Sequence, residues 1–186
     1  MNTITEPQPG KFVNPAEIIH LLELKEGSTF ADFGSGSGAY VLAAAPLVGQ
    51  TGQIYAIDIQ KDLLLKLKQS AADAGHDNVK FLWCDFEELG ATKLANDSLD
   101  VIVISNTLFQ LESKTGALKE AHRVLKNTGK LYIIDWSESY KGMGPEQSLI
   151  VDKGNALDLI TASGFVLQSE FNPGEHHYGL ICIKNK

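Results

Sequence analysis

Cysteine is scarce in this sequence of 186 residues, which contains only Cys84 and Cys182. Neither cysteine lies in a CxxC pair or near clustered histidines, so a disulfide framework and a zinc site are both disfavoured. No apolar stretch approaches the roughly 20 residues that a membrane-spanning helix needs, and the amino terminus lacks the apolar segment of a secretion signal. We therefore expect no metal site, no membrane span and a cytoplasmic location.

Basic residues are fewer than acidic ones, since the chain has 16 Lys and Arg and 23 Asp and Glu, and its formal net charge is −7 at pH 7. This balance disfavours general binding to nucleic acid or to an anionic membrane. The length suits one domain of roughly 100–200 residues. Because the start of the chain is polar and carries Pro7, Pro9 and Gly10, we expect a flexible arm over residues 1–12 and a single domain over residues 13–186.

Apolar runs alternate with segments of helical periodicity along most of the chain, which is typical of a parallel sheet covered by helices on both faces. Asn172-Pro173-Gly174 separates the last two apolar runs and predicts an antiparallel hairpin at the sheet edge. Residues 137–151 lack periodicity and are long enough to act as a lid. The sequence predicts strands at residues 29–33, 53–58, 79–83, 99–105, 130–136, 165–171 and 178–183, and helices at residues 14–24, 39–48, 61–74, 114–126 and 153–163.

The most informative segment is a predicted strand that runs directly into Gly34, Gly36 and Gly38 and then into a helix. Glycine permits positive φ angles and close approach of a ligand to the backbone, and the amino end of a helix attracts an anionic group. The same letters also fit the dinucleotide-binding fingerprint. The turn therefore predicts a ligand without identifying it, and a tight turn with no ligand is the alternative.

Two carboxylates narrow the choice of ligand. Asp58 ends the second predicted strand, twenty residues after Gly38, where a carboxylate can accept hydrogen bonds from both hydroxyls of a ribose. Asp85 follows the third strand, whose end lies beside the same crevice, and there it can meet an adenine amino group. The alternative for each residue is a capping role in the adjacent turn or helix. Neither carboxylate separates nicotinamide from other adenosine cofactors.

With these motifs in this order, the chain resembles the class I S-adenosylmethionine-dependent methyltransferases from residue 14 to residue 184. It is most similar to the methyltransferase type 11 group, which is related to the quinone-biosynthesis C-methyltransferases. The resemblance implies an α/β, doubly wound, Rossmann-like sheet of seven strands, mostly parallel with an antiparallel last strand. It also implies S-adenosylmethionine as cofactor and S-adenosylhomocysteine as product. The resemblance rests on residues 32–38, Asp58, residues 84–86, residues 105–111 and residues 123–131.

The resemblance also assigns roles to residues of these motifs. Asp32 would orient the methionine portion of the cofactor, which the glycine turn would hold with backbone groups. Asp58 would bind the ribose, and Asp85 would contact the adenine. The residues that it implies for cofactor binding are Asp32, Gly34, Ser35, Gly36, Gly38, Asp58, Ile59, Asp85, Phe86, Ser105 and Asn106.

The end of the fourth predicted strand would lie beside the methyl group that is transferred. Ser105 and Asn106 end this strand, while Leu108 and Phe109 either wall the pocket or pack in the core. The chain departs from the family in two places. Residues 126–129 replace a common Lys-Pro-Gly-Gly turn, and the region over residues 137–151 is short, which argues against a bulky polyprenyl acceptor.

Methyl transfer from a sulfonium requires alignment and exclusion of water more than a dedicated acid or base. A hydroxyl or carbon acid as acceptor would still benefit from a base. Consecutive strand residues point to opposite faces, so at most one of two adjacent histidines would face the pocket. A solvated turn is the alternative for these residues. The base candidates are His176, His177, Tyr178 and Tyr140, and further pocket candidates are Trp136, Glu138, Tyr40 and Phe12.

Four alternatives to a small-molecule methyltransferase remain open at this point. An NAD-linked oxidoreductase would use the same glycine turn and ribose carboxylate, but no catalytic domain for it is visible. A non-catalytic module that binds S-adenosylmethionine and a protein methyltransferase both fit the motifs. A nucleic-acid base methyltransferase is disfavoured because Ser105 to Leu108 replace the Asn/Asp-Pro-Pro-aromatic segment that grips a flipped base. We expect the methyl acceptor to be a small molecule.

Overall fold

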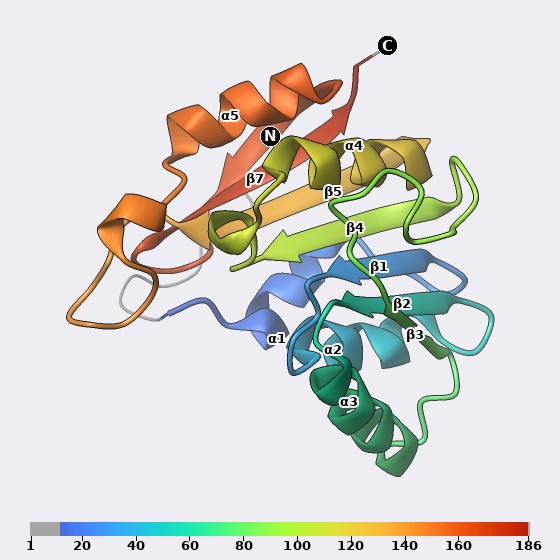
Figure 1. The fold of residues 1–186 in the computed structure, drawn as a ribbon. Helices are drawn as coiled ribbons and strands as arrows, with labels where there is room; N and C mark the ends of the chain where they lie inside the picture. The colour runs from blue at the N-terminus through green and yellow to red at the C-terminus, as the bar shows by residue number, and fades with distance from the viewer. Residues whose placement is uncertain (1–11, 186) are drawn as a thin grey trace, which may run out of the picture.

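The computed structural model of the protein describes residues 12–185, so residues 1–11 of the expected arm lie outside the described residues. Seven strands form one sheet in the order β3-β2-β1-β4-β5-β7-β6 (Figure 1). The predicted hairpin is present as the antiparallel pair β6 and β7. The strands are β1 (Thr29–Phe33), β2 (Gln53–Asp58), β3 (Val79–Trp83), β4 (Leu99–Ser105), β5 (Leu125–Trp136), β6 (Phe165–Phe171) and β7 (His177–Lys184).

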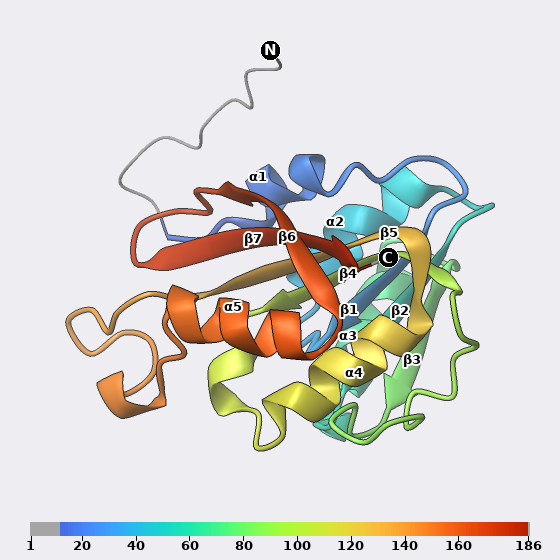
Figure 2. The same cartoon turned by 90° about the horizontal axis from the view of Figure 1, so that it is seen from above.

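Helices cover both faces of this sheet. The first three α-helices pack on one face, and α4 and α5 lie on the other, as the two perpendicular views show (Figures 1 and 2). None of the helices within residues 12–185 is long and apolar enough to cross a membrane. The helices are α1 (Pro15–Ile18), α2 (Ala39–Val48), α3 (Lys61–Asp73), α4 (Lys114–Val124) and α5 (Lys153–Ala162), with short 3-10 turns η1 (Ile19–Leu22), η2 (Leu108–Gln110) and η3 (Gln147–Leu149).

The direction of the strands brings several strand ends to one edge of the sheet. β1 to β5 run parallel to one another, so their carboxyl ends lie together. β7 runs antiparallel to β5 and places His177 opposite Trp136, so the amino end of β7 joins the same edge. This arrangement confirms the expected α/β, Rossmann-like sheet of seven strands with an antiparallel last strand.

The core explains why the central strands are almost wholly apolar. Alternate residues of β4 belong to two buried clusters, one on each face of the sheet, with Ile102 and Ile104 in one and Val101 and Val103 in the other. A parallel sheet that is covered on both faces buries both sets of side chains. Continuous apolar runs, rather than alternating ones, were therefore the correct signal for these strands.

The first helix differs from the expected span of residues 14–24. Asn14 is its N-cap, because the Asn14 side chain accepts a hydrogen bond from the Ala16 amide, and Pro15 occupies the first helical position. After Ile18 the backbone tightens into η1, and Glu23, in the left-handed region with φ 54°, ends the segment. The start of this helix was therefore predicted correctly, whereas its regular α-helical length was overestimated.

The fifth strand also differs from the prediction, because it begins at Leu125 and not at residue 130. Leu125 pairs with Leu99, and the register then shifts so that Lys130 pairs with Val101. Residues 126–129, expected to form a turn, are thus taken up as an irregularity within the strand. Gly129 suits this place because a Cβ there would lie 2.9 Å from the Asp100 carbonyl oxygen.

Candidate functional site

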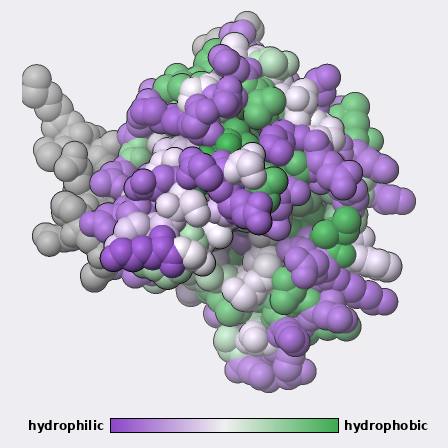
Figure 3. Space-filling model, turned by 60° about the vertical axis from the view of Figure 1, so that its left-hand side comes forward, coloured by the Kyte–Doolittle hydropathy of each residue, from purple (hydrophilic) through white to green (hydrophobic). Residues whose placement is uncertain are grey.

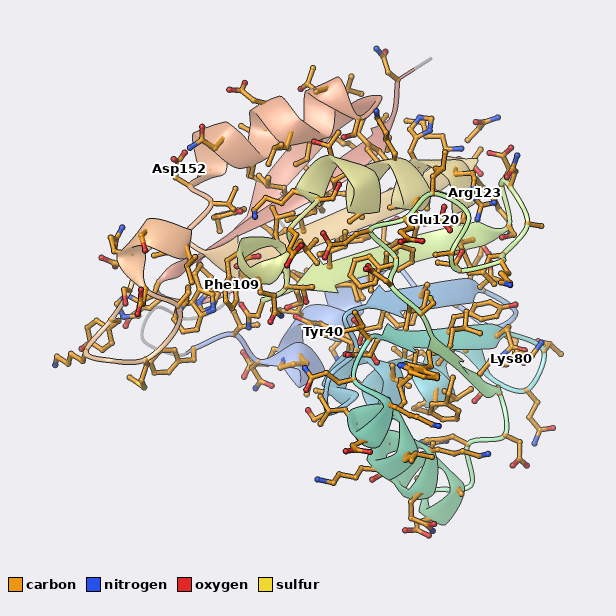
Figure 4. All side chains as sticks on the ribbon, viewed as in Figure 1. Tyr40, Lys80, Phe109, Glu120, Arg123 and Asp152 are labelled. Carbon is orange, nitrogen blue, oxygen red and sulfur yellow. The ribbon has the colours of Figure 1, made fainter. Side chains whose placement is uncertain are left out.

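A cavity of about 390 Å³ lies at the carboxyl ends of β1 and β4. From this adjacent pair the chain continues to β2 on one side and to β5 on the other, which is the switch point where ligands bind in doubly wound sheets. Figure 4 labels Tyr40 at this edge and Phe109 on η2 beside it. The described residues that line the cavity are Val13, Pro15, Asp32, residues 34–37, Ala39, Tyr40, residues 58–60, residues 85–87, residues 105–107, Gln110 and Leu111.

The glycine turn between β1 and α2 is fastened to the end of β2. The amides of Gly34 and Ser35 donate to the Ile57 carbonyl oxygen at 2.9 and 3.0 Å, and the Gly36 amide donates to Asp58 Oδ2 at 2.8 Å. These amides are therefore used within the protein. The helix α2 begins at the turn with no side-chain cap, so its amino end is the part of the turn that suits an anionic group.

Asp58 joins the two loops that flank the cavity. Its Oδ2 accepts the Gly36 amide, and its Oδ1 accepts the Gln60 amide at 2.8 Å. The side chain is nearly buried, yet it lines the cavity. Because each carboxylate oxygen has two acceptor sites, Asp58 retains capacity for the hydroxyl groups of a ligand.

Asp32 lies deeper, at the floor of the same cavity. Burial and the neighbouring charge of Asp58 raise the pKa of Asp32 to about 8. Tyr40 lies close by, and burial raises the pKa of its hydroxyl as well. Ser105 Oγ donates to the Tyr40 hydroxyl oxygen at 3.4 Å, which links α2 to the end of β4. Carboxyl groups whose pKa is shifted toward neutral pH are common in the cavities of functional sites.

Two polar atoms of the cavity wall have no protein partner among the described residues. Ser35 Oγ and Asn106 Oδ1 are both buried and unpaired. Asn106 is also held in the left-handed region, with φ 52°. A buried polar atom without a partner costs roughly 1–3 kcal/mol. These atoms therefore indicate a ligand that offers hydrogen-bonding groups to this wall.

The charge of the cavity is negative. Asp32, Asp58, Asp85 and Glu87 line it, and no Lys, Arg or His occurs among the described residues of the lining. Figure 3 turns this side of the molecule toward the viewer and shows a mainly hydrophilic surface with scattered apolar patches. An acidic cavity favours a cationic ligand and disfavours the pyrophosphate of a dinucleotide.

The structure brings together all but one of the residues expected at the cofactor. Gly38 is the exception, since it is absent from the lining described above and packs against Leu67 of α3. Sequence reasoning did not single out several residues of the wall. Gln60 and Glu87 each lie two residues after a carboxylate that was singled out, and Gln110 lies within the motif of residues 105–111. The residues missed are Val13, Pro15, Gln60, Glu87 and Gln110.

Replacing Gly38 by alanine should destabilise the fold. Gly38 has φ +83°, and a Cβ there would lie 2.0 Å from Leu67 Cδ1 and 2.8 Å from Leu67 Cγ. Leu67 is buried in the core and cannot rotate freely away. Gly75 is a matched control, because it has φ +74° with open space around its Cβ position. We expect Gly38→Ala to lower the free energy of unfolding in urea by about 2 kcal/mol more than Gly75→Ala does; equal losses would contradict the packing argument.

The four acid–base candidates lie beside the cavity without lining it. His176 stacks on Tyr140 with ring centroids 4.0 Å apart, and its Nδ1 is 2.8 Å from Glu138 Oε1. The ring of His177 packs against Trp136 at a tilt of 41°, with a centroid distance of 4.1 Å. The remaining candidate, Tyr178, is buried and donates its hydroxyl to the Val151 carbonyl oxygen at 3.0 Å. Their catalytic role therefore stays a prediction.

The other apolar residues expected near the cavity lie in several different environments. Leu108 is fully buried in the core, and Phe109 lines a separate cavity against α5. Phe86 packs against Phe33 at 5.1 Å and lines the main cavity. Phe12, the first described residue, lies against Tyr140 at a centroid distance of 6.4 Å. Within residues 12–185 no group of three or more His, Cys, Asp or Glu side chains is placed to hold a metal ion.

Comparison with known proteins agrees with this geometry. Residues 24–170 match the family described as "Methyltransferase domain". Arsenite methyltransferase from Aquipseudomonas alcaligenes is 38% identical over 117 residues, which cover 60% of this chain and 34% of that protein. The ubiquinone/menaquinone biosynthesis C-methyltransferase UbiE from Azotobacter vinelandii is 31% identical over 121 residues, covering 64% and 47%. This chain therefore spans less than half the length of both relatives.

A solved structure resembles nearly the whole chain. The SAM-dependent methyltransferase from Aquifex aeolicus superposes with a TM-score of 0.83 at 25% identity, covering 92% of this chain and 90% of that one. The similarity therefore includes the sheet, both helical layers and the edge that carries the cavity.

Proposed function

Because the chain belongs to the class I S-adenosylmethionine-dependent methyltransferases, we propose that it binds S-adenosylmethionine in the acidic cavity and methylates a small organic molecule. The single observation that carries the choice of ligand is the charge of the cavity, which has four carboxylates and no basic side chain among its described lining residues. S-adenosylmethionine is a cation, whereas NAD carries an anionic pyrophosphate. When bound, S-adenosylmethionine supplies a methyl group on a positively charged sulfur.

The residues present fit this cofactor. Asp58 has spare acceptor sites for the ribose hydroxyls, and Asp85 with Phe86 would hold the adenine. Asp32 and the uncapped amino end of α2 would bind the charged methionine end. The unpaired Ser35 Oγ and Asn106 Oδ1 would gain hydrogen-bond partners from the ligand. The polar groups named here would thereby each contact a polar group of the cofactor.

We place the methyl acceptor at the end of the cavity beside β4. Tyr40 of α2 lines the cavity together with Ser105 and Asn106 at the end of β4, and Val13 and Pro15 contribute to the lining from the amino-terminal segment. These residues would exclude water and orient the acceptor. The base candidates His176 and His177 lie farther along the same edge, where they could reach only an acceptor that extends beyond the cavity.

The cysteines argue against arsenite as the acceptor. Arsenic(III) is a soft centre that thiolates bind, but burial raises the pKa of Cys84 to about 11 and that of Cys182 to about 12. Cys84 follows β3 and Cys182 lies in β7, five strand spacings apart in the sheet, or about 24 Å. The two thiols therefore cannot bind one arsenic atom, and an organic acceptor is the better proposal.

A binding titration tests the cofactor assignment. We expect S-adenosylhomocysteine to bind the purified protein with micromolar affinity by calorimetry, and NAD to give no comparable heat because the cavity repels its pyrophosphate. Tighter binding of NAD would overturn the proposal. Turnover of isotopically labelled S-adenosylmethionine with the small-molecule, protein and RNA fractions of a cell extract then tests the acceptor. Label entering only the protein fraction would favour a protein side chain, and label entering no fraction would favour a binding module.

A further inference from the structure

Asp135 is a buried carboxylate at the carboxyl end of β5, with a relative exposure of 1%. Its Oδ1 accepts the Trp136 amide at 2.8 Å, and the amides of Leu108 and Phe109 in η2 also face the carboxylate and hold its pKa down. Its Oδ2 is buried without a partner among the described residues. Asp135 is therefore the side chain of β5 that meets the start of η2.

The segment that Asp135 meets is one wall of the cofactor cavity. Asn106, Thr107, Gln110 and Leu111 all line the cavity, and they flank or belong to η2. The amide of Asn106 donates to the Ile134 carbonyl oxygen of β5 at 2.8 Å, one residue before Asp135. The end of β5 thus holds this wall through both its backbone and its last acidic side chain.

The wall in turn contacts the glycine turn. Thr107 packs so closely on Gly34 that a Cβ at Gly34 would lie 2.5 Å from Thr107 Oγ1. Thr107 is itself fixed, because its hydroxyl donates to the Ser105 carbonyl oxygen at 2.9 Å. A displacement of η2 would therefore move the residue against which the glycine turn rests. This contact connects Asp135 to the part of the cavity that faces the methionine portion of the ligand.

Keeping a carboxylate at this position costs stability. Burial raises the pKa of Asp135 to about 6, although the amides that face it and the charge of Lys114 on α4 oppose the rise. The other titratable group facing it is Tyr178 of β7, which pairs with Asp135 across the sheet. The surrounding residues of β5, Leu131 and Ile133, belong to the apolar core. An apolar side chain would satisfy packing alone at lower cost.

We propose that Asp135 is a positioning residue that holds η2 against the glycine turn and thereby sets the affinity of the cavity for its adenosyl ligand. Asp135 does not line the cavity and acts through Asn106 and Thr107. The inference rests on the proposed function, because it concerns the same ligand and the same cavity.

The test compares Asp135→Asn with a matched control, Asp100→Asn. Asp100 is also a carboxylate that accepts hydrogen bonds, from the Thr29 amide at 2.9 Å and Lys126 Nζ at 2.8 Å, but it lies at the opposite end of β4. We expect Asp135→Asn to weaken S-adenosylhomocysteine binding about tenfold in calorimetry, as loss of a hydrogen bond to a charged group would, and Asp100→Asn to leave the affinity unchanged.

The free energy of unfolding of Asp135→Asn gives a second measurement, and it should change in the opposite direction to the ligand affinity. Because the folded pKa of Asp135 is raised, its contribution to stability is present at low pH and is lost as the pH rises toward 6. The amide in Asp135→Asn does not titrate. We expect the variant to gain stability relative to wild type between pH 4 and pH 7 while it binds the ligand more weakly. A residue with a merely structural role would lose stability and affinity together.

The outcomes separate the two proposals. If wild-type protein does not bind S-adenosylhomocysteine, the proposed function fails. If wild type binds and both variants bind equally well, the positioning role of Asp135 is overturned. If Asp135→Asn does not fold, amide hydrogen exchange of the wild-type protein tests the positioning role instead. After correction for intrinsic exchange rates, the protection of residues 108–111 should fall as the pH is lowered through 6. Protection that does not change with pH would also overturn the role.

Discussion

Replacing Asp58 by alanine should weaken the binding of S-adenosylhomocysteine by roughly 100-fold or more, because two hydrogen bonds to a charged group each contribute roughly 1.5–3 kcal/mol. Asp58 faces the cavity and also anchors the Gly36 and Gln60 amides, each at 2.8 Å. The variant would lose both the ribose acceptor and the fixed position of the glycine turn. Calorimetric titration of purified wild type and Asp58→Ala measures the difference directly.

Two controls separate these causes. Asp73→Ala removes an exposed carboxylate of α3, which accepts a hydrogen bond from Gln69 Nε2 at 2.7 Å, and should leave the affinity unchanged. An analogue of S-adenosylhomocysteine that lacks one ribose hydroxyl should bind wild type more weakly than the parent ligand, yet bind Asp58→Ala with nearly the same affinity as the parent. If Asp58→Ala keeps wild-type affinity, the ribose assignment is wrong.

The affinity for S-adenosylmethionine should rise steeply with pH below 8. Burial and the charge of Asp58 raise the pKa of Asp32 to about 8, so Asp32 is protonated at neutral pH in the ligand-free protein. A cationic ligand favours the ionised carboxylate, and binding therefore releases a proton. The dissociation constant should fall up to tenfold per pH unit between pH 6 and pH 8, since one pKa unit corresponds to about 1.4 kcal/mol.

Asp32→Asn is the variant that tests this pH dependence. An amide does not ionise, so the variant should bind S-adenosylmethionine weakly and with a shallow dependence on pH. Calorimetry in buffers of different ionisation enthalpy counts the protons released by wild type. The stability of the ligand-free protein changes with pH in the opposite direction to the affinity. Because the folded pKa of Asp32 is raised, the stability that its protonated form contributes is lost as the pH rises toward 8. A flat pH profile in wild type would remove Asp32 from contact with the cation.

Much of the fold could be predicted because the signals were local. The central strands were read from continuous apolar runs. Gly75 and Gly164 end the helices before the edge strands β3 and β6 with φ +74° and +90°, as glycine allows. The start of β5 could not be read in this way. Its first residue, Leu125, completes the helical spacing of α4 and also pairs with Leu99, so only the tertiary contact decides where the helix ends.

The residues of the candidate site likewise divide into those that local sequence signals predicted and those that only tertiary contacts reveal. Asp58 and Asp85 were found because each lies at or just after the carboxyl end of a strand whose direction the fold class fixes, whereas the role expected of Asp32 came from the family resemblance. Val13 and Pro15 were missed as cavity residues because nothing in their own segment indicates that it crosses the end of β4. The contact of Asp135 with η2 was missed for a similar reason, since its partners are backbone amides and no pattern of side chains records them.

The acidic cavity has a consequence for turnover. Loss of the methyl group removes the positive charge from sulfur, so the spent molecule is neutral overall where the fresh one is a cation. The acidic side chains of the cavity should attract the cationic methyl donor more than its neutral product. We expect this difference in electrostatic attraction to ease product inhibition in the proposed methyl transfer.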